Sequence, residues 1–485
     1  MPDSWWLILL VTGEWLLRLV MAGVVLLRRN ARSSTSLAWI AVILVVPVFG
    51  VLLFLSLGLT RLGRWRIKRH REIVARVENA EVKPPCPEVL LANDLPNAAR
   101  RLAALAESLG ATPAVGGNAL DLMGDTDVVI QRMAEDIDAA QDHCHLLFYI
   151  YLDDHSGTRI GDALVRAARR GVACRLLVDG LGSRAFLRSP LCARMRAGGV
   201  RIAEALPVNA FRILFSRVDL RNHRKIMVTD GRIGYTGSQN IANADFAPKA
   251  RYAPWVDAMV RVEGPVVRDL QTLFVEDWFL DTDESLEALL GDVPAAVTSE
   301  TSPGVVTQVY ATGPNMPPEV TRTLVQAAMQ MAQEELVLTT PYFVPDDALV
   351  STLATGARRG VEVTLIVPAR NDSRLVALAS RAFYGVLLDS GVRILEFRDG
   401  LLHAKTLTVD RDIGIVTSAN IDRRSFDINF EAGLLVYDDD FASELRFLQG
   451  GYMSQSTPVD RRRWLHRPVR TRLAENSAVL LAPLL

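Results

Sequence analysis

The sequence predicts an α/β protein built from two tandem, related lobes and preceded by an N-terminal pair of membrane helices. One observation is an internal repeat: ARRGVACRLLV at 168–178 matches ARRGVEVTLIV at 357–367, and GVRI recurs at 199–202 and 391–394. Both matches keep an offset of about 190 residues, which is typical of a duplicated domain because solenoid repeats are about 20 to 50 residues long. The other observation is that two long apolar runs lie within residues 1–60.

Each lobe begins with a helical pattern that leads into an apolar strand. Ile130, Met133 and Ile137 recur with helical spacing before HLLFYIY, and Val320 and Leu324 do the same before LVLTTPYF. Because helix and strand then alternate, each lobe is predicted to be an α/β sandwich around a mixed sheet, the two related by pseudo-two-fold symmetry.

The expected domain boundaries follow from these patterns. They are a membrane-anchoring helical hairpin at 1–60, a basic juxtamembrane segment and linker at 61–117, a first lobe at 118–292 and a second lobe at 305–485. The stretch VPAAVTSETSPG, which ends at Gly304, is predicted to be the hinge between the lobes.

The apolar runs predict how the chain meets a membrane. Residues 37–59 carry no charge and are long enough to cross a hydrocarbon core of about 30 Å. Residues 5–27 are equally apolar but include Glu14 and Arg18, which lie four apart and can pair on one helical face. More basic residues follow the second run than separate the two, so the lobes are expected on the cytoplasmic side of a multi-pass protein.

Composition excludes some classes of partner and cofactor. The formal net charge of −1 over 485 residues indicates no broad basic surface, so no nucleic-acid partner is expected. The four cysteines show neither metal-ligand spacing nor the density of a disulfide scaffold. No metal and no other cofactor are expected.

Two matching motifs carry the chemistry. In HRKIMVTDGRIGYTGSQN and HAKTLTVDRDIGIVTSAN the same residue types recur at equal spacing: His223, Lys225, Asp230, Ser238 and Asn240, then His403, Lys405, Asp410, Ser418 and Asn420. If each motif starts as a strand, His and Lys at i and i+2 share a face, and the turn after it returns Ser and Asn beside them. Imidazole, ammonium, hydroxyl and amide groups around one point are suited to a tetrahedral phosphate.

Two such half-sites supply what a double displacement needs. A neutral imidazole can attack phosphorus while the other donates a proton to the leaving alkoxide and then accepts one from the incoming alcohol. The lysines and amides neutralise charge that a metal ion would otherwise balance.

The motifs resemble the paired H-x-K-x4-D-x6-G-S-x-N signatures of the phospholipase D superfamily, over both lobes from about Asn118 to the C-terminus. Thr417 departs from the pattern, because the family has glycine there. Among the branches, the chain is most similar to bacterial-type cardiolipin synthases, in its RNHRK and LHAK settings, in NIDRRSFDINFE, in the apolar LAWIAVILVVPVFG and in the closing RLAENSAVLLAPLL.

The resemblance implies a phosphatidyltransferase of a bacterial inner membrane that makes cardiolipin and glycerol from two molecules of phosphatidylglycerol through a phosphohistidine. It implies His223 as nucleophile and His403 as general acid and base, with the reverse assignment left open. It also implies that Lys225, Asp230, Lys405 and Asp410 are catalytic residues. Asp257 and Glu431 would orient the histidines, or be ordinary charges at strand ends. The lysines, Ser238, Asn240, Ser418 and Asn420 would hold phosphate oxygens. The alternatives are a hydrolase of the phospholipase D type or another phosphatidyltransferase with the same paired histidine site, and a membrane scaffold without catalysis.

Other residues have two readings. His143, His145 and His155 are favoured as residues of a strand and its surroundings rather than metal ligands. Arg212, Arg217 and Arg221 would hold an anionic headgroup or form a solvated face, while Tyr149 and Tyr342 belong to core strands or line the site. The C-terminal SAVLLAPLL is too short for a span and is expected to pack on the core rather than enter the membrane interface.

Overall fold

The structure is a computed structural model, and it describes residues 4–27, 33–46, 48–58, 64–79, 95–207, 217, 219–285, 304–317 and 319–480. The chain divides into two compact units, Met1–Ile67 with Val208–Leu220, and Lys68–Pro207 with Arg221–Leu485. The predicted hinge at 293–304 lies outside the described residues except for Gly304.

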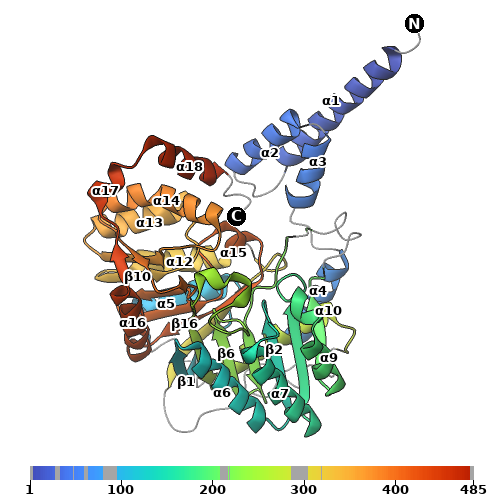
Figure 1. The fold of residues 1–485 in the computed structure, drawn as a ribbon, viewed down its shortest axis with the longest axis vertical. Helices are drawn as coiled ribbons and strands as arrows, with labels where there is room; N and C mark the ends of the chain where they lie inside the picture. The colour runs from blue at the N-terminus through green and yellow to red at the C-terminus, as the bar shows by residue number, and fades with distance from the viewer. Residues whose placement is uncertain are drawn as a thin grey trace. The chain divides into compact units, whose positions relative to one another are not determined.

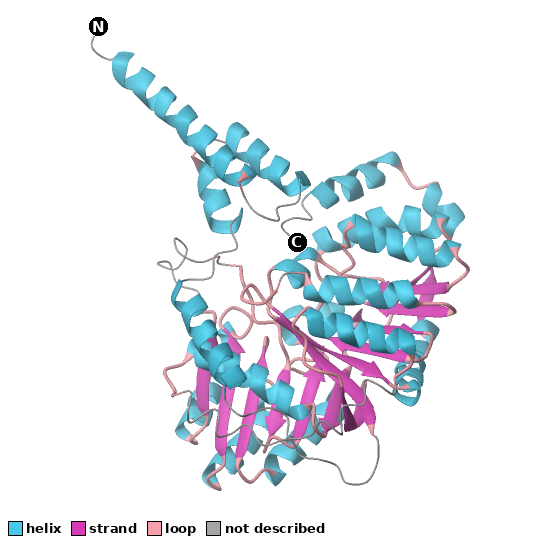
Figure 2. Cartoon of the chain, turned by 180° about the vertical axis from the view of Figure 1, so that it is seen from behind, coloured by secondary structure: helices cyan, strands magenta, loops and turns pink. Residues whose placement is uncertain are grey.

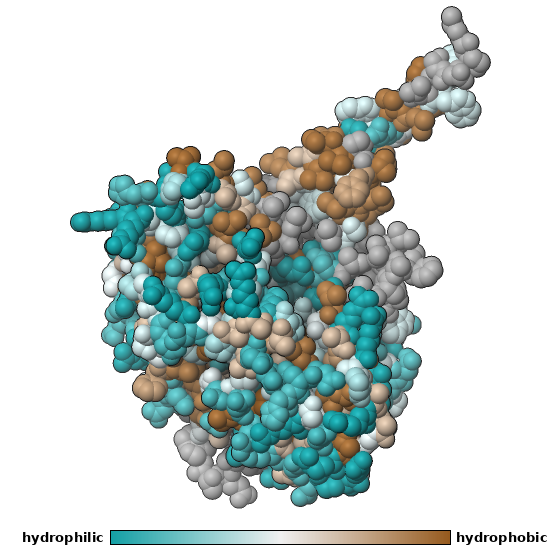
Figure 3. All heavy atoms as spheres, in the orientation of Figure 1, coloured by the Kyte–Doolittle hydropathy of each residue, from teal (hydrophilic) through white to brown (hydrophobic). Residues whose placement is uncertain are grey.

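The smaller unit contains the apolar helices. These are α1 (Ser4–Leu26), α2 (Ser33–Val45), α3 (Phe49–Leu53) and a π-helix (Phe54–Gly58). Met21 and Val25 of α1 pack against Ile43, Val51 and Phe54. Figure 3 shows apolar side chains gathered over these helices.

Arg18 and Glu14 form the expected pair, with Nη2 and Oε1 2.6 Å apart, and Arg18 Nη1 also donates to the carbonyl of Leu44 at 2.8 Å. These contacts satisfy the two charges inside the small unit, which explains how an otherwise apolar helix carries them.

The predicted second span is not one continuous helix, and this corrects the sequence analysis. Among the described residues only Ile8–Leu26 is long and apolar enough to cross a membrane. Helix α2 has 13 residues, about 20 Å at 1.5 Å per residue. Pro47 follows it and has no N–H to donate, and Val48 has a φ of 49°, so the helical path is broken before α3.

The larger unit is built on one 15-stranded sheet (Figure 2). The strands of the first lobe are β1 (Val115–Met123), β2 (His143–Phe148), β3 (Ala173–Asp179), β4 (Arg201–Ala205), β5 (Ile226–Thr229), β6 (Ile233–Gly237) and β8 (Met259–Glu263). Those of the second are β9 (Val305–Thr312), β10 (Glu335–Thr339), β11 (Glu362–Pro368), β12 (Arg393–Phe397), β14 (Thr406–Val409), β15 (Ile413–Thr417), β16 (Glu431–Tyr437) and β17 (Ser456–Pro458).

The two lobes repeat one topology. Outward from the central β1–β9 pair, the strand order is β1-β8-β6-β5-β2-β3-β4 on one side and β9-β16-β15-β14-β10-β11-β12 on the other. In each lobe three strands pair in parallel (β2-β3-β4 and β10-β11-β12) and the others pair antiparallel. The predicted mixed sheets and the duplication are therefore confirmed.

Helices cover both faces of the sheet (Figure 1). In the first lobe they are α6 (Thr126–Ala139), α7 (His155–Arg169), α8 (Arg184–Leu187), α9 (Pro190–Ala197) and α10 (Val267–Asp281). In the second they are α12 (Val320–Met331), α13 (Asp347–Arg358), α14 (Arg374–Asp389), α15 (Arg423–Asp427), α16 (Asp439–Ser454), α17 (Arg461–Leu465) and α18 (Val469–Leu480). The helices predicted around Ile130 and Leu324 are α6 and α12.

Alternate residues of the strands enter different cores. Leu146 packs with α6, α7 and α9, while the next residue, Leu147, packs with α10 on the other face. The core around α10 also contains Leu434 of β16 and Phe441 of α16, so it joins the two lobes. This shared core holds the lobes in one body around the site.

The segment predicted as a linker at 61–117 contains two helices that are part of the folded unit. Ile73 of α4 (Arg64–Asn79) lies in the core around α10. Helix α5 (Asn97–Ser108) buries Leu102 and Ala106 against α12 of the second lobe. Only residues 80–94 between them lie outside the described part, so the linker prediction was too long.

Candidate active site

Both H-x-K motifs lie just before a strand of the sheet rather than within it. Strand β5 begins at Ile226 and β14 at Thr406, one residue after each lysine. The predicted strand is shorter because the backbone N–H of His223 donates to Phe430 O at 2.8 Å, a partner in the other lobe. The N–H of His403 likewise donates to Val256 O at 2.7 Å.

These two backbone contacts exchange short segments between the lobes. Phe430 pairs with Asn222 in a parallel bridge, and β7 (Trp255–Val256) pairs in parallel with β13 (Leu401–Leu402). The residue that follows each of these accepting carbonyls is acidic: Glu431 follows Phe430, and Asp257 follows Val256. Each acid is thus carried to the histidine of the opposite lobe.

The side chains complete two reciprocal pairs. His223 Nδ1 lies 2.9 Å from Glu431 Oε2, and His403 Nδ1 lies 2.7 Å from Asp257 Oδ1. Both carboxylate residues are buried, and the His223 side chain is 11% exposed. With Nδ1 engaged, Nε2 of each ring is the nitrogen available to a reacting phosphate.

The two serines contact the carboxylates, which differs from the expectation that they hold phosphate. Ser238 Oγ donates to Asp257 Oδ1 at 2.6 Å and accepts from the N–H of Ala258 at 3.0 Å. Ser418 Oγ donates to Glu431 Oε2 at 2.5 Å and accepts from the N–H of Ala432 at 3.0 Å. Both hydroxyls are fully buried, so they fix the acids instead.

The two asparagines are not equivalent. Asn240 Oδ1 accepts from the N–H of Ile150 at 3.0 Å. Asn420 donates its backbone N–H to Ser425 Oγ at 3.1 Å, and its Oδ1 is buried without a hydrogen-bond partner among the described residues. Neither amide is used by the carboxylates, so both are consistent with the predicted place beside substrate.

Both lysines are buried next to the histidines. Lys225 Nζ donates to the carbonyl of His223 at 2.6 Å, and Lys405 Nζ to that of His403 at 2.5 Å. Each ammonium has three donors, so two remain for an incoming anion. Burial lowers the pKa of Lys225 to about 7 and that of Lys405 to about 8.

Burial also keeps both imidazoles neutral. It lowers the pKa of His223 to about 4, against the opposing attraction of Glu431, and it lowers the pKa of His403 as well. Lys405 contributes to lowering the pKa of His223, and Lys225 does so for His403, so the charges of each half-site act on the other. A neutral ring is the nucleophilic form of histidine.

The acids remain ionised. Burial would raise the pKa of Asp257, but His403, Lys405 and Ser238 outweigh it and hold that pKa at about 2. Burial likewise acts to raise the pKa of Glu431, and the charge and hydrogen bond of His223 reverse this so that its pKa is lowered. An ionised acid at Nδ1 stabilises the imidazolium that forms when Nε2 takes a proton.

Asp230 and Asp410 lie outside the site, and this corrects their assignment as catalytic. Asp230 follows β5, and its carboxylate accepts the N–H groups of 141, 142 and 143 at 2.8–2.9 Å. Asp410 follows β14 and accepts those of 333, 334 and 335 at 2.7–2.9 Å. Each therefore ties a hairpin turn to the start of the neighbouring strand, at the end away from the lysine.

Arg224 is a residue of the site that the sequence analysis missed. It is fully buried, pairs with Asp277 at 2.7 Å, and donates across the lobes to the carbonyls of Glu431 at 3.2 Å and Thr312 at 3.1 Å. It therefore holds the backbone of the acid that contacts His223. The difference between HRK and HAK was the available signal, since Ala404 stands at the matching place.

Aromatic rings lie against both histidines. Tyr149 makes an edge contact with His223 at 4.9 Å between ring centroids, and Trp255 lies 4.6 Å from His403. Tyr149 therefore lies at the site, which was one of the two interpretations of this residue. Trp255 was not singled out, because its contact depends on the exchanged β7 segment.

Thr417 stands where the family has glycine, and its backbone conformation differs from that of Gly237 in the first motif. Gly237, its counterpart, has a φ of 153°, and a Cβ there would lie 2.4 Å from Ala258 O. Thr417 avoids that geometry, and its hydroxyl donates to Ala432 O at 3.1 Å.

The remaining candidates have structural contacts. The ring nitrogens of buried His145 lie 2.7 Å from Arg175 Nη1 and 2.6 Å from Gln271 Nε2, in keeping with a core strand. Arg217 pairs with Asp219 at 2.5 Å, Arg221 is buried, and Arg212 lies outside the described residues.

Comparison with known proteins agrees with this geometry. A family model described as "Cardiolipin synthase, PLD-like domain" matches residues 133–278 and 325–447, and one described as "Phospholipase_D-nuclease N-terminal" matches 17–58. Among solved structures, phosphatidylserine synthase from Haemophilus influenzae Rd KW20 is similar in fold, with a TM-score of 0.60 and 15% identity over 80% of this chain and all of that one.

Curated relatives are similar from end to end. Cardiolipin synthase A of Serratia proteamaculans (strain 568) is 38% identical over 488 residues, covering 99% of this chain and 98% of the relative. Cardiolipin synthase A of Yersinia pseudotuberculosis serotype O:1b (strain IP 31758) is 38% identical over 490 residues, with the same coverage. The chain therefore belongs to the cardiolipin synthase family, a family of phosphatidyltransferases within the phospholipase D superfamily.

Proposed function

We propose that the chain transfers the phosphatidyl group of one phosphatidylglycerol to a second, releasing glycerol and forming cardiolipin. In the first step Nε2 of neutral His223 attacks phosphorus, the bond from phosphorus to the glycerol oxygen breaks, and His403, which takes a proton on Nε2 when the phosphate anion binds, gives that proton to the oxygen. In the second step a hydroxyl of the other phosphatidylglycerol attacks phosphorus, His403 takes its proton, and the phosphorus–nitrogen bond breaks.

The observation that carries this proposal is the reciprocal pairing of His223 with Glu431 and of His403 with Asp257. A double displacement needs two imidazoles, each with Nδ1 held and Nε2 free. Burial lowers the pKa of His223 to about 4, which supports its role as the neutral nucleophile, although the near symmetry of the pairs makes the reverse assignment chemically equivalent.

The lysines supply the charge that the phosphate requires. Their depressed pKa values belong to the empty site, and an arriving phosphate anion would stabilise the protonated ammonium groups of Lys225 and Lys405. Together with the amides of Asn240 and Asn420 they would hold the non-reacting oxygens. The two acids are in turn positioned by Ser238, Ser418 and Arg224.

We infer that the lobes act at a bacterial inner membrane, with the helix Ile8–Leu26 as the anchor. The excess of basic residues at 61–71 favours the cytoplasmic side for the lobes.

The direct test supplies the purified full chain with phosphatidylglycerol as the only lipid. Transfer predicts cardiolipin and free glycerol in equal amounts, and no phosphatidic acid. If phosphatidic acid and glycerol formed instead, water would be the acceptor and the chain would be a hydrolase with the same site.

A further inference from the structure

One side of helix α18 is apolar and faces away from the core. Val469, Leu473 and Leu480 are 77%, 67% and 79% exposed, and intervals of four and seven residues place them on one side of the helix. On the opposite side Glu475 and Ala478 are buried, and Ala478 packs with Val376 and Ala379, the latter two from α14. The helix is thus fixed to the second lobe by one face and presents leucine and valine on the other.

Basic side chains border this apolar line. Arg462 and Arg463 of α17, and Arg470 and Arg472 of α18, are exposed and make no ion pair with the residues that the structure describes. The one acid of α18, Glu475, is buried and pairs with Arg467 at 3.1 Å. Figure 3 shows hydrophobic and hydrophilic side chains side by side on this edge of the molecule.

The helix also lies close to the site. Ala478 and Val479 pack in one cluster with Tyr342, whose hydroxyl donates to Asp372 at 2.7 Å. Burial chiefly raises the pKa of Tyr342, and Tyr149, which contacts His223, also contributes to raising it. The apolar line therefore belongs to the side of the second lobe from which the site is built.

We propose that the outward face of α18, with the arginines of α17 and α18, docks on the surface of an anionic phospholipid bilayer. Exposed leucines bordered by arginines have the chemistry of an interfacial helix, whose apolar face enters the headgroup region while its cations contact lipid phosphates. This is a contact of the catalytic unit itself, additional to the N-terminal anchor, and it brings the site to the lipid. Of the C-terminal SAVLLAPLL at 477–485, Ala478 packs on the core as expected and Leu480 is exposed, while 481–485 lie outside the described residues.

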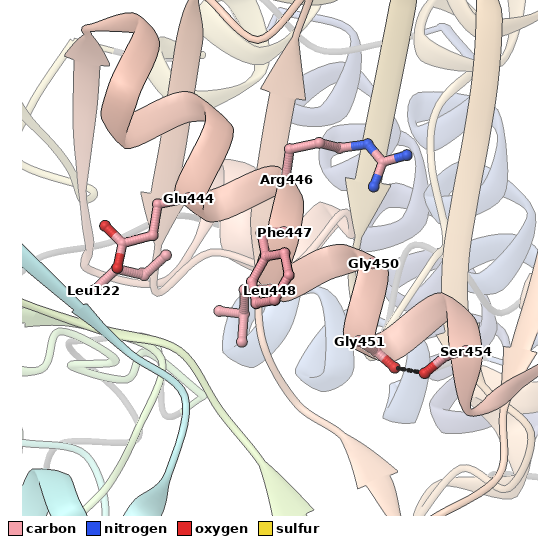
Figure 4. A pocket seen from close by; sticks show the side chains of 8 residues that line it. All are labelled: Leu122, Glu444, Arg446, Phe447, Leu448, Gly450, Gly451 and Ser454. Carbon is pink, nitrogen blue, oxygen red and sulfur yellow. Dashed lines mark hydrogen bonds between the residues drawn. The ribbon is translucent and has the colours of Figure 1, made fainter.

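A second exposed apolar surface, on α16, lacks these features and serves as a control. There Phe447, 83% exposed, borders an open groove with Leu122 and Leu448 (Figure 4). The neighbouring Arg446 is already paired with Glu335 at 2.8 Å. Without unpaired cations, this groove has no complementarity to an anionic surface.

Depth measurement tests the proposal without relying on turnover. The full chain, with Cys86→Ser to remove a competing thiol, is reconstituted in vesicles of phosphatidylglycerol and phosphatidylcholine and spin-labelled at Leu473→Cys or at Phe447→Cys. The other cysteines are buried. The label at 473 is expected about 5–10 Å below the phosphates, accessible to oxygen and shielded from a water-soluble nickel chelate, whereas the label at 447 stays in water.

Two outcomes would overturn the proposal. The first is a label at 473 as accessible to the nickel chelate as the label at 447. The second is a label at 473 that is shielded from both reagents and broadened by a neighbouring spin, since a second copy of the chain would then cover the face. Because the label reports depth alone, failure of the proposed transfer reaction would leave this result unchanged.

Kinetics provide an independent readout. The double variant Val469→Glu, Leu473→Glu is expected to raise the apparent KM for phosphatidylglycerol in vesicles about tenfold, with unchanged kcat and unchanged melting temperature. The matched variant Phe447→Glu should leave KM unchanged. An unaltered KM in the double variant would contradict the docking role.

Discussion

His223 and Glu431 are 208 positions apart in the sequence, yet Nδ1 of the one lies 2.9 Å from Oε2 of the other. Asp257 and His403 repeat the relationship in the opposite direction, with Oδ1 and Nδ1 2.7 Å apart. Each lobe thus contributes a histidine and the acid for its partner's histidine. Neither half-site is complete without the other lobe, so the core shared by α10 and α16 is a condition of activity as well as of stability.

Replacing either acid by its amide should reduce kcat while the fold is kept. Glu431→Gln and Asp257→Asn remove the charge that stabilises an imidazolium and alter the tautomer preference of the ring, so kcat should fall by about 10²–10⁴-fold. The KM for phosphatidylglycerol should change little, because the acids contact the histidines and not the lipid. Glu335→Gln, which alters an ion pair with Arg446 at the start of β10, is the matched control. A kcat within threefold of wild type in both acid variants would contradict an orienting role.

Replacing the serines separates positioning from phosphate binding. Ser418→Ala removes the 2.5 Å hydrogen bond to Glu431 and should lower kcat by less than Glu431→Gln does. Affinity for a phosphate analogue such as vanadate should stay at the wild-type value, measured by inhibition. A loss of vanadate affinity with unchanged kcat would restore the sequence-based view that the serine holds phosphate.

Asp230 and Asp410 should matter for stability and not for chemistry. Asp230→Asn keeps a residue that tolerates the positive φ of 51° but replaces a charged acceptor of three backbone N–H groups. A loss of about 1–3 kcal/mol in the free energy of unfolding is expected, seen as a lower melting temperature. At 25 °C kcat should be unchanged, and a kcat as low as that of His223→Ala would reinstate Asp230 as a catalytic residue.

Arg224 should be required both for folding and for the placement of Glu431. Arg224→Ala leaves Asp277 buried without its cation, and such a change costs about 3–5 kcal/mol. Arg224→Lys keeps the charge, but one ammonium group cannot contact Asp277 and both carbonyls as the planar guanidinium does. It should therefore retain most of the stability and lose activity through kcat. Wild-type kcat in Arg224→Lys would show that the contact with Glu431 O is dispensable.

The pH dependence of kcat/KM should report the two lysines. Each is a cation below its pKa, and burial lowers these values to about 7 for Lys225 and about 8 for Lys405. As pH rises through this range the free enzyme loses positive charge, so kcat/KM should begin to fall at about pH 7 and fall more steeply above about pH 8. The kcat profile should extend further into the alkaline range, because bound phosphate stabilises the ammonium forms. Profiles of kcat and kcat/KM that decline together would contradict this role.

The sequence predicted what depends on local pattern and missed what depends on the meeting of the lobes. Equal spacing in the two motifs identified His223 and His403, and helical and alternating periods identified α6, α12 and the strands. The same equal spacing made Asp230 look catalytic, because spacing does not reveal to which end of a strand a side chain belongs. The resemblance named Asp257 and Glu431 as the acids beside the histidines, but which acid meets which histidine depends on the exchange of Phe430 and Val256 between the lobes, which no local pattern shows.

Two segments also have a structure that their average composition did not predict. Residues 97–108 follow a proline-rich stretch and were predicted to be linker, but apolar residues at helical spacing, such as Leu102 and Ala106, pack against the second lobe. The uncharged run at 37–59 read as one span, yet Pro47 divides it. In both segments the structure depends on particular residues rather than on the average composition.

The most direct test of the account is to quench the full chain during turnover with phosphatidylglycerol labelled in its phosphate and to map the labelled peptide by mass spectrometry. The account predicts a phosphatidyl adduct on the His223 peptide, absent from His223→Ala. Cardiolipin formation with no adduct on either His223 or His403, in samples quenched early with the chain in excess over phosphatidylglycerol so that few acceptor molecules remain, would contradict the two-histidine mechanism.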